Sequence, residues 1–557
     1  MNVAKHHFKR TALAFFLFFA SVQTIAQNSI APTTDALGLA RDAHIPVDYY
    51  TGRLNISIPF GQVEGRELSV PISITYNTKG HRVNDIAGAA GLGWSLNAGG
   101  LITRIVRGGP DDLANGFCKP SPTDSEPDIF FYNFLGQTGK FVLDKNGNAI
   151  TIPFRNIVIV PGICKTAATG EWQIIDENGR SYKFGTSSLH RETTTSTPLS
   201  GAATTYTSSW FLSEVTSPNN TDKIQFNYYN SATITSKNFY FEKVSCESTP
   251  RDKSTTITAQ TRYISSITST TGGSASFSWS YNRRDGGGLS LNGIYLYNRL
   301  NEQISKYKLE YSYFQSDGCS TSECFRLRLD KIYDLAPDPL YQFTYNTSIN
   351  LPSRFSKSID HWGHYNNNTV DSWIPRVLPT DNQYLIPRLG SGTYPPRISY
   401  SIGAIRDPDP TRCVANSITR MDNRGGGFQT FEFTHDGAGG LSIKKIVMTD
   451  GQGNELTRNF VYSGGGIGIP STYAIVGDGA SFIFSHALMD FWGFSSLAGY
   501  TQVDEFNQNN EKLVYKYYPA RTMNYDDNGK IRWYNLDWMS GKLNSVSVYD
   551  NAGRILK

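Results

Sequence analysis

Long apolar stretches are almost absent from this chain of 557 residues. The one clear run, Thr11 to Val22, follows three basic residues and precedes a small-residue cleavage site at Thr24–Gln27, a pattern typical of a secretory signal. The run is too short to cross a bilayer comfortably, and no later stretch resembles a membrane helix. We expect residues 1–27 to be a signal peptide. The mature protein should then be secreted, periplasmic or at the cell surface, with no transmembrane segment.

The chain also lacks an excess of charge of either sign. Removing the three cations of the signal leaves 49 of the 52 Lys and Arg residues, against 48 Asp and Glu. Proteins that bind polyanions carry a basic patch or stripe, and a nearly neutral chain has no such footprint. This balance predicts that nucleic acid is not a partner.

Recognisable catalytic motifs are missing as well. The sequence has no GxSxG, HExxH or GxxxxGK[ST], and "GGGIGIP" from Gly464 lacks the third glycine of a dinucleotide loop. The paired acids Asp111–Asp112 and Asp407/Asp409 are expected to be solvated turn residues and not a glycosidase pair. We therefore predict no enzymatic activity and no cofactor.

The strongest polar cluster is "DHWGH", Asp360 to His364. On a helix, His361 and His364 would share a face and could bind a metal. Gly363 and the Asn residues that follow favour a loop instead, with Trp362 packed inside as a structural residue and the histidines in hydrogen bonds. We predict no metal site here.

Cysteine is scarce, with six residues, all after the signal. An even number in an exported chain allows disulfides. Cys319 and Cys324 bracket "CSTSEC" between two strand-like runs, so we expect them to pair across a loop. Their spacing does not suit a metal site. The other four can pair in three ways, and the sequence leaves these open.

What the chain has in abundance is aromatic residues and glycine. It contains 32 Tyr, 31 Phe and 51 Gly, and apolar residues alternate with polar ones in many short runs. "RLNISIPF" and "RELSVPISITYN" are the first such pair, and Pro59 and Pro71 in them predict an edge strand or a bulge. "GLGW", Gly91 to Trp94, is too rich in glycine for a helix; we expect close backbone approach there under a buried, structural Trp94.

A short turn motif, Asp-x-x-Gly, recurs between strand-like runs. The Asp side chain can accept hydrogen bonds from amides two residues on, and Gly takes the positive-φ position. The five copies indicate a repeated hairpin. They are Asp144/Gly147, Asp176/Gly179, Asp450/Gly453, Asp526/Gly529 and Asp550/Gly553.

These patterns predict a mainly β protein. One hairpin cannot bury its apolar face alone, so we expect a long antiparallel meander of repeated hairpins, curved into a shell-like or sandwich sheet. The expected organisation is a signal peptide (1–27), an N-terminal β module with the Gly-rich GLGW segment (28–110), a hairpin-repeat region (111–377), a loop or linker (378–412) and a second hairpin region (413–557).

Several stretches resemble the N-terminal regions of exported RHS/YD-repeat proteins of the Bacteroidetes type. They are "VDYYTGRLNISIPF", "GLGWSLNAGGLITRIVRGGPDD", "EPDIFFYNFLGQTGKFVLD", "SSWFLSEVTSPNNTDKIQFNYY", "RLRLDKIYD", "DHWGHYNN" and the closing "VYDNAGRILK". The resemblance implies hairpin repeats wound into a large hollow shell, which in some members encloses a toxin. This chain differs in having no RHS-core-like segment and no C-terminal effector. It is expected to be a short member or a piece of a longer gene.

The function that this resemblance implies is that of a non-enzymatic scaffold or shell, part of a polymorphic-toxin or cell-surface assembly. Protein partners, or a downstream RHS segment, would join through an open sheet edge at Val548–Lys557. A module that binds surface carbohydrate is the alternative, because aromatic faces stack on sugar rings. A hydrolase is a third hypothesis.

Overall fold

The computed structural model describes residues 47–557 except 121, 123, 125, 166–168, 199–201, 245–250, 361, 374–402, 436–439, 465–480, 486–498, 519–520, 526–530 and 536–540. The described residues belong to one unit, Ile45–Lys557. The predicted signal peptide, most of the predicted linker, His361, Cys246 and the turn at Asp526–Gly529 lie outside them.

Strands of a small first sheet open the fold. It contains β1 (Val47–Asp48), β2 (Arg53–Glu64), β3 (Ser69–Thr78) and β4 (Trp94–Asn97), in that order and all antiparallel. Its apolar residues alternate as predicted, and one face of β2 and β3 is buried from Leu54 to Tyr76. The register of β2 against β3 shifts between Pro59 and Gly61, which confirms the bulge.

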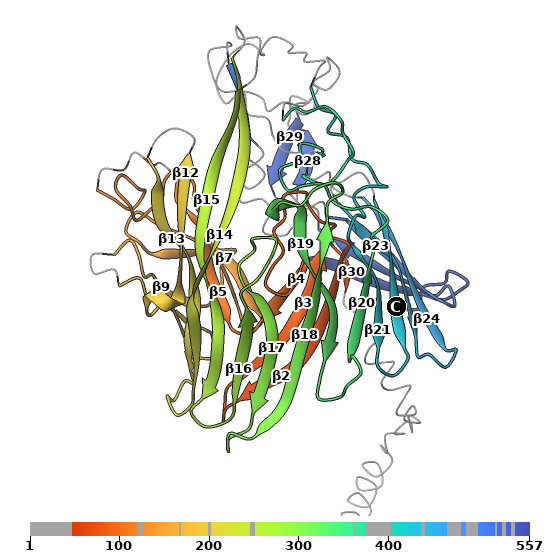
Figure 1. The fold of residues 1–557 in the computed structure, drawn as a ribbon, viewed down its shortest axis with the longest axis horizontal. Coiled ribbons are helices and arrows are strands. Elements are labelled where there is room, and N and C mark those ends of the chain that lie inside the picture. Colours follow the sequence, from red (N-terminus) through yellow and green to blue (C-terminus); the bar gives the residue numbers. More distant parts are fainter. Residues whose placement is uncertain are drawn as a thin grey trace, which may run out of the picture. The chain divides into compact units, whose positions relative to one another are not determined.

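A second, 24-stranded antiparallel sheet takes up most of the chain (Figure 1). Its first strands are β5 (Gly100–Ile105), β6 (Ile129–Phe134), β7 (Gln137–Leu143), β8 (Ala149–Ile152), β9 (Val158–Val160), β10 (Trp172–Ile175), β11 (Ser181–Phe184), β12 (Arg191–Pro198), β13 (Thr204–Thr216), β14 (Lys223–Val244), β15 (Arg251–Ser269) and β16 (Ser274–Ser280).

The later strands are β17 (Ser290–Tyr297), β18 (Gln303–Gln315), β19 (Phe325–Tyr333), β20 (Tyr341–Tyr345), β21 (Ile418–Asn423), β22 (Phe428–Thr434), β23 (Ser442–Thr449), β24 (Glu455–Ser463), β25 (Ser481–Ser485), β26 (Gln502–Asn507), β27 (Lys512–Tyr517) and β30 (Leu543–Tyr549). A separate hairpin pairs β28 (Arg521–Tyr525) with β29 (Ile531–Asn535). Two 3-10 turns, η1 (Ser188–His190) and η2 (Ser322–Cys324), complete the elements.

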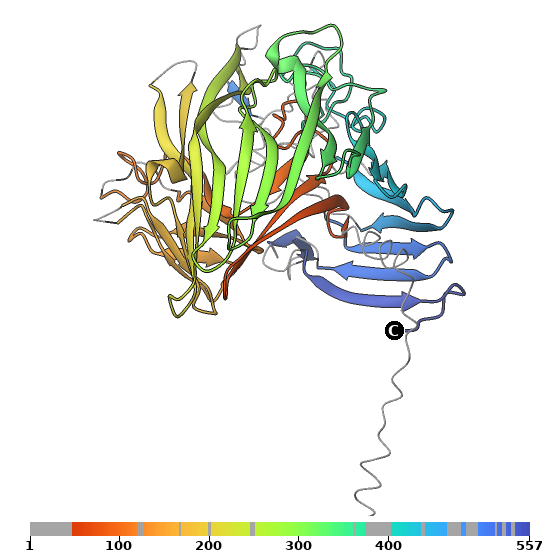
Figure 2. The same cartoon turned by 60° about the horizontal axis from the view of Figure 1, so that its bottom comes forward.

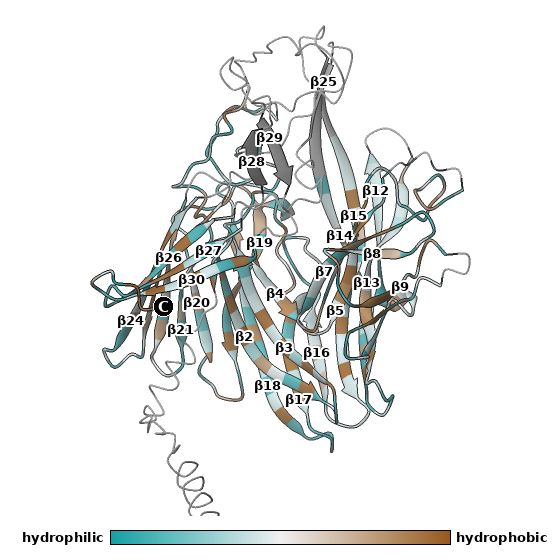
Figure 3. Cartoon of the chain, turned by 180° about the vertical axis from the view of Figure 1, so that it is seen from behind, coloured by the Kyte–Doolittle hydropathy of each residue, from teal (hydrophilic) through white to brown (hydrophobic). Residues whose placement is uncertain are grey.

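Most strands of the large sheet pair with the next strand along the chain, which confirms the predicted meander. The order departs from this where β5 pairs with β13, β12 with β15, and β14 with β25. Figure 3 shows apolar and polar residues alternating along strands such as β2 and β17. The change from the small to the large sheet falls between Asn97 and Gly100, ahead of residue 110, where we expected the first module to end.

The small sheet packs on one face of the large one as a second layer, visible as the red strands of Figure 2. Backbone hydrogen bonds join the two layers at widely separated points. Leu92 N donates to Leu327 O (2.8 Å), Ile443 N to Gly52 O (2.9 Å) and Gly273 N to Glu64 O (3.1 Å). Aromatic and aliphatic side chains pack between them, and the ring of the buried Phe60 lies 4.8 Å from the ring of the half-buried Tyr307. Within the described residues, no helix has the length and apolar character needed to cross a membrane.

Candidate functional site

Asp360 forms a tight turn with Trp362, Gly363 and His364, the loop that the glycine and the asparagines predicted. Asp360 Oδ1 accepts hydrogen bonds from the backbone N–H groups of Trp362 (2.8 Å) and His364 (2.9 Å), and Asp360 N donates to His364 O. Asp360 is 1% exposed and Trp362 is buried with it. The carboxylate therefore serves to hold the turn closed.

This turn packs on the loop that joins β3 to β4. Val83 N donates to Gly363 O (2.9 Å), and His364 Nδ1 lies 3.3 Å from His81 O. His81 Nε2 in turn lies 3.2 Å from the Tyr76 hydroxyl, which also accepts a hydrogen bond from Ile418 N. A chain of polar contacts thus runs from the turn through the first sheet to the start of β21.

The GLGW segment reaches the same place from the other side. Trp94 is buried, and its indole Nε1 donates to the Tyr345 hydroxyl at 3.0 Å. Gly93 has φ +80°, and a Cβ there would lie 2.6 Å from the Tyr76 ring. The GLGW segment and the turn at Asp360–His364, far apart in sequence, therefore converge on Tyr76. We call the residues around it, Tyr76, His81, Trp94, Asp360 and His364, the Tyr76 hub.

Burial dominates the electrostatics of the hub. It lowers the pKa of both His81 and His364 to about 3, with nearby cations acting in the same direction. It also raises the pKa of Asp360 to about 7, and burial raises the pKa of the Cys413 thiol, a neighbour of the hub, to about 12. Both imidazoles are therefore neutral and the thiol is protonated near neutral pH. Such groups suit hydrogen bonding inside a core better than proton transfer with solvent.

The acid pair Asp111–Asp112 is not the solvated turn pair that the sequence suggested. Asp111 and Asp128 are fully buried and bond reciprocally: Asp128 N donates to the Asp111 carboxylate (3.1 Å) and Asp111 N to Asp128 Oδ2 (3.2 Å). Arg104, also buried, contacts Asp112 Oδ1 at 2.8 Å and Asp128 Oδ2 at 3.4 Å. The expectation was wrong because it considered only the residues next to Asp111 in the sequence. In the fold, Arg104 on β5 and Asp128 just before β6 flank the loop that carries Asp111 and Asp112. Asp407 is exposed.

The structure places disulfides between Cys319 and Cys324 and between Cys118 and Cys164, and Cys413 is buried with a free thiol. In the part of the chain that the structure describes, one group of three side chains could hold a metal: Asp111, Cys118 and Cys164. Because its two sulfur atoms are joined to each other, they are not available as thiolate ligands.

Four of the five Asp-x-x-Gly turns lie within the described residues. In each, Asp Oδ1 accepts from the amides two and four residues on. The glycines all have positive φ, with values of 70° at Gly147, 78° at Gly179, 101° at Gly453 and 77° at Gly553.

Gly147 and Gly453 lie in different surroundings, although the sequence predicts the same surface turn at both. Gly147 is buried, and a Cβ there would clash with the backbone oxygen of Cys164, so this glycine also makes room for a disulfide-linked loop. Gly453 is exposed, and a Cβ there would meet nothing within 4 Å. The Gly N–H donates to the Asp carbonyl at Gly147 (2.9 Å), Gly179 and Gly553, but no such bond is seen at Gly453 in the described structure. The motif determines the Asp contacts and the sign of φ, whereas the surroundings of each glycine depend on tertiary packing.

Two turns of the same kind, which begin at Asn298 and Asn507, do not match the Asp-x-x-Gly motif and were not predicted. There Asn301 and Asn510 take the positive-φ position of the glycine, and asparagine tolerates that conformation. A search for Asp or Asn at the first position, with Gly or Asn at the fourth, would have found them.

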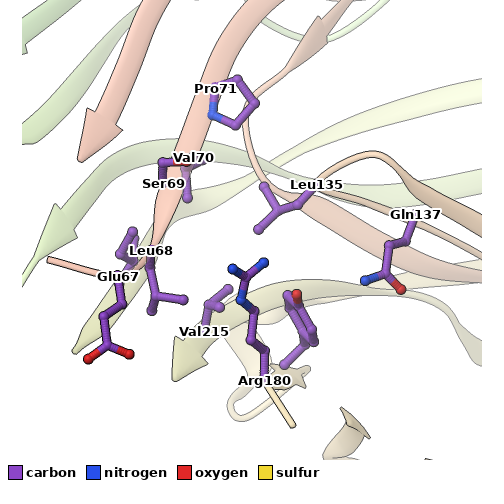
Figure 4. Close-up of a pocket in the computed structure, with 11 residues that line it drawn as sticks. Glu67, Leu68, Ser69, Val70, Pro71, Leu135, Gln137, Arg180 and Val215 are labelled. Carbon is purple, nitrogen blue, oxygen red and sulfur yellow. The ribbon is translucent and has the colours of Figure 1, made fainter. Parts of the chain in front are cut away.

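A cavity of about 220 Å³ lies beside the tip of the β2–β3 hairpin (Figure 4). Residues from β3, from the turn before β7, and from β11, β13 and β14 line it. Arg180, the residue after the Asp176–Gly179 turn, extends into it, with Leu135 and Gln137 on the facing wall. The role of Arg180 in the lining could not be predicted from the sequence, since nothing in a turn motif indicates which way the next side chain points.

No family model and no curated protein matches the sequence. Among solved structures, the N-terminal domain of effector protein SpvB from Salmonella typhimurium strain LT2 is similar at 13% identity and a TM-score of 0.27, covering 51% of this chain and 99% of that one. A porin-like protein from Bacteroides uniformis ATCC 8492 is similar at 10% identity and a TM-score of 0.18, covering 64% and 92%.

Proposed function

We propose that the chain is an exported, non-enzymatic scaffold of the RHS/YD type, in which the large sheet is a structural wall and the small sheet a brace. The observation that carries the proposal is the Tyr76 hub. The residues that looked most like an active site, Asp360 and His364, are buried, and the hydrogen bonds described above join them to neighbouring backbone.

A scaffold role also fits the way the two sheets are joined. Their backbone hydrogen bonds spread over β19, β23 and the turn after β15, so that the small sheet ties together strands that are distant along the meander. Export rests on the signal-like residues 1–27. Assignment to a toxin-related or cell-surface assembly rests on the family resemblance.

The test compares the mature chain with an Asp360/His361/His364 triple-alanine variant. A scaffold predicts no turnover by either protein across panels of glycosidase, esterase and peptidase substrates, together with a lower unfolding midpoint for the variant. Turnover by the mature chain that the variant loses, at a temperature where both are folded, would establish a hydrolase instead.

A carbohydrate-binding module remains the second candidate, supported by the polar cavity at Arg180. A glycan array separates the two, because a pure scaffold retains no glycan. Solution scattering of the mature chain gives a further check, since separate flexible beads in place of one ordered β body would contradict the scaffold.

A further inference from the structure

The Arg180 cavity is built by segments that the fold holds rigidly. Asp222 binds the tip of the β2–β3 hairpin through its carboxylate. Its Oδ2 accepts hydrogen bonds from Glu67 N (2.7 Å) and Leu68 N (3.0 Å), and its Oδ1 accepts one from the Thr271 hydroxyl (2.6 Å). This contact places Leu68, Ser69 and Val70 along one wall. The opposite wall comes from Leu135 and Gln137, across the turn between β6 and β7.

The turn that carries Arg180 is equally fixed. Asp176 Oδ1 accepts from Arg180 N at 2.9 Å, and Asp176 Oδ2 accepts from the Tyr182 hydroxyl at 2.9 Å and from Gln137 Nε2 at 3.4 Å. The Asp176 carboxylate is therefore already surrounded by donors from its own turn and its neighbours. Burial and Asp176 hold the pKa of Tyr182 above its usual range, while Arg180 acts in the opposite direction.

No ion pair among the described residues involves the guanidinium of Arg180. Glu67 is the acid among the residues that line the cavity, and its Oε1 accepts hydrogen bonds from Asn219 Nδ2 (2.8 Å) and the Thr221 hydroxyl (3.0 Å). Figure 4 shows the Glu67 carboxylate turned away from the guanidinium. Around the guanidinium of Arg180, the lining therefore presents neutral polar and apolar groups, and the Glu67 carboxylate faces away from it.

We propose that this cavity binds an anionic monosaccharide, one that bears a carboxylate or a phosphate group. A guanidinium is a planar fork of donors that matches either anion with two parallel hydrogen bonds. The volume of about 220 Å³ is below the roughly 300–1,000 Å³ typical of sites for drug-sized ligands, which limits the ligand to about one sugar ring. Ser69 and Gln137 supply hydroxyl and amide groups for the ring hydroxyls, and Leu68 and Val70 supply an apolar wall.

The absence of an acid facing the guanidinium within the described lining also decides the ligand's charge. A zwitterion such as an amino acid would need a carboxylate for its ammonium group, and the Glu67 side chain points the other way. A neutral sugar would offer no anion to form charge-assisted hydrogen bonds with the guanidinium of Arg180. The proposal does not depend on the scaffold role, since a scaffold with or without this site has the same fold.

The experiment is a titration of the mature chain with glucuronate, glucose 6-phosphate and glucose, in which calorimetry or ligand-observed NMR measures binding. We expect saturable binding of at least one of the two acids in roughly the millimolar range, and much weaker binding of glucose. Whichever acid binds identifies the anion. No saturable binding of either acid, or equal binding of glucose, would overturn the proposal.

Three variants assign the binding to Arg180. Arg180→Gln is expected to weaken binding about tenfold or more, because it removes a charge-assisted pair of hydrogen bonds. Arg180→Lys keeps the positive charge and loses the planar pair of donors. Its affinity for the acid should lie between the affinities of the unmodified chain and of Arg180→Gln. Arg299→Gln changes an exposed arginine on the β17–β18 turn and should bind as the unmodified chain does. Equal affinity of Arg180→Gln and Arg299→Gln, with both folded by circular dichroism, would refute the assignment.

Discussion

Gly93 and Gly136 have nearly the same backbone φ, +80° and +82°, in very different surroundings. A Cβ at Gly93 would lie 2.6 Å from the Tyr76 ring and 2.9 Å from His81, whereas one at Gly136 would meet nothing within 4 Å. We expect Gly136→Ala to cost about 1–2 kcal/mol from the left-handed backbone alone. Gly93→Ala should cost about 1–3 kcal/mol more, because it overpacks the Tyr76 hub.

Urea unfolding of the two variants measures this difference. The comparison cancels the backbone contribution, since both glycines adopt the same φ. Equal losses of unfolding free energy would mean that the hub has room to rearrange around Tyr76.

The buried pair Asp111 and Asp128 predicts a pH dependence of stability. Burial raises their pKa values to about 7 and about 6, and the mutual proximity of the two acids adds to the shift of Asp111. Groups with a raised folded pKa contribute stability that is complete below the unfolded pKa near 4. That contribution is lost as the pH rises through the folded pKa.

We therefore expect the free energy of unfolding to fall between pH 4 and pH 7 by on the order of 1–3 kcal/mol. Asp111→Asn should flatten this part of the profile, because an amide oxygen can still accept from Asp128 N and carries no charge. The exposed Asp407→Asn is the control and should leave the slope unchanged. A free energy of unfolding that rises with pH in this window would contradict the prediction. A pH dependence that Asp111→Asn leaves unchanged would contradict it as well.

At the scale of the element, the aspartates of the hairpin turns differ in their contacts. Some bond only within their own turn, whereas others also bond to residues of neighbouring strands. The Oδ2 atom of Asp450 bonds to Asn454, within its own turn, whereas Asp176 also accepts from Tyr182 and Gln137. The turns at Asn298 and Asn507 have an asparagine in this position, so the amide supports the same geometry. We expect Asp450→Asn to change stability by less than about 0.5 kcal/mol.

Asp176→Asn should cost about 1–3 kcal/mol, because it removes the acceptor of a buried tyrosine hydroxyl. Thermal unfolding of both variants is the measurement. If the two losses match, the contacts of Asp176 beyond its turn contribute nothing measurable.

These turns also show how far the sequence determined the fold. Alternation of apolar and polar residues and the chemistry of turns are local features of the sequence. The buried face from Leu54 to Tyr76, the hairpins and the meander could therefore be predicted. The pairing of β14 with β25, and the contact between His364 and His81 over 283 positions, could not. Such contacts depend on which buried surfaces meet after the hairpins have formed, and no local pattern encodes that choice. The burial of Asp111 was missed for the same reason.

At the scale of the whole molecule, the last strand of the large sheet lies at an edge. Among the described strands, β30 pairs only with β27. On its other side the chain turns back at Asp550–Gly553, and Val548 N donates to Lys557 O (2.8 Å) while Leu556 N donates to Val548 O (2.7 Å). The returning residues therefore cover the end of β30 and leave its first part, from Leu543 to Ser547, without a neighbouring strand in the described structure.

An edge of this kind recruits other strands, particularly where apolar side chains accompany it. Leu543 and Val546 on β30 and Ile555 and Leu556 beyond it are 41–66% exposed. We expect the mature chain to self-associate through β30, with a weight-average mass that rises with concentration in sedimentation experiments. Val546→Lys places a charge on the edge and should keep the protein monomeric, whereas Val461→Lys, on the doubly paired β24, should not. A chain that stays monomeric at high concentration, with the amides of β30 protected from hydrogen exchange, would show that the returning residues close the edge by themselves.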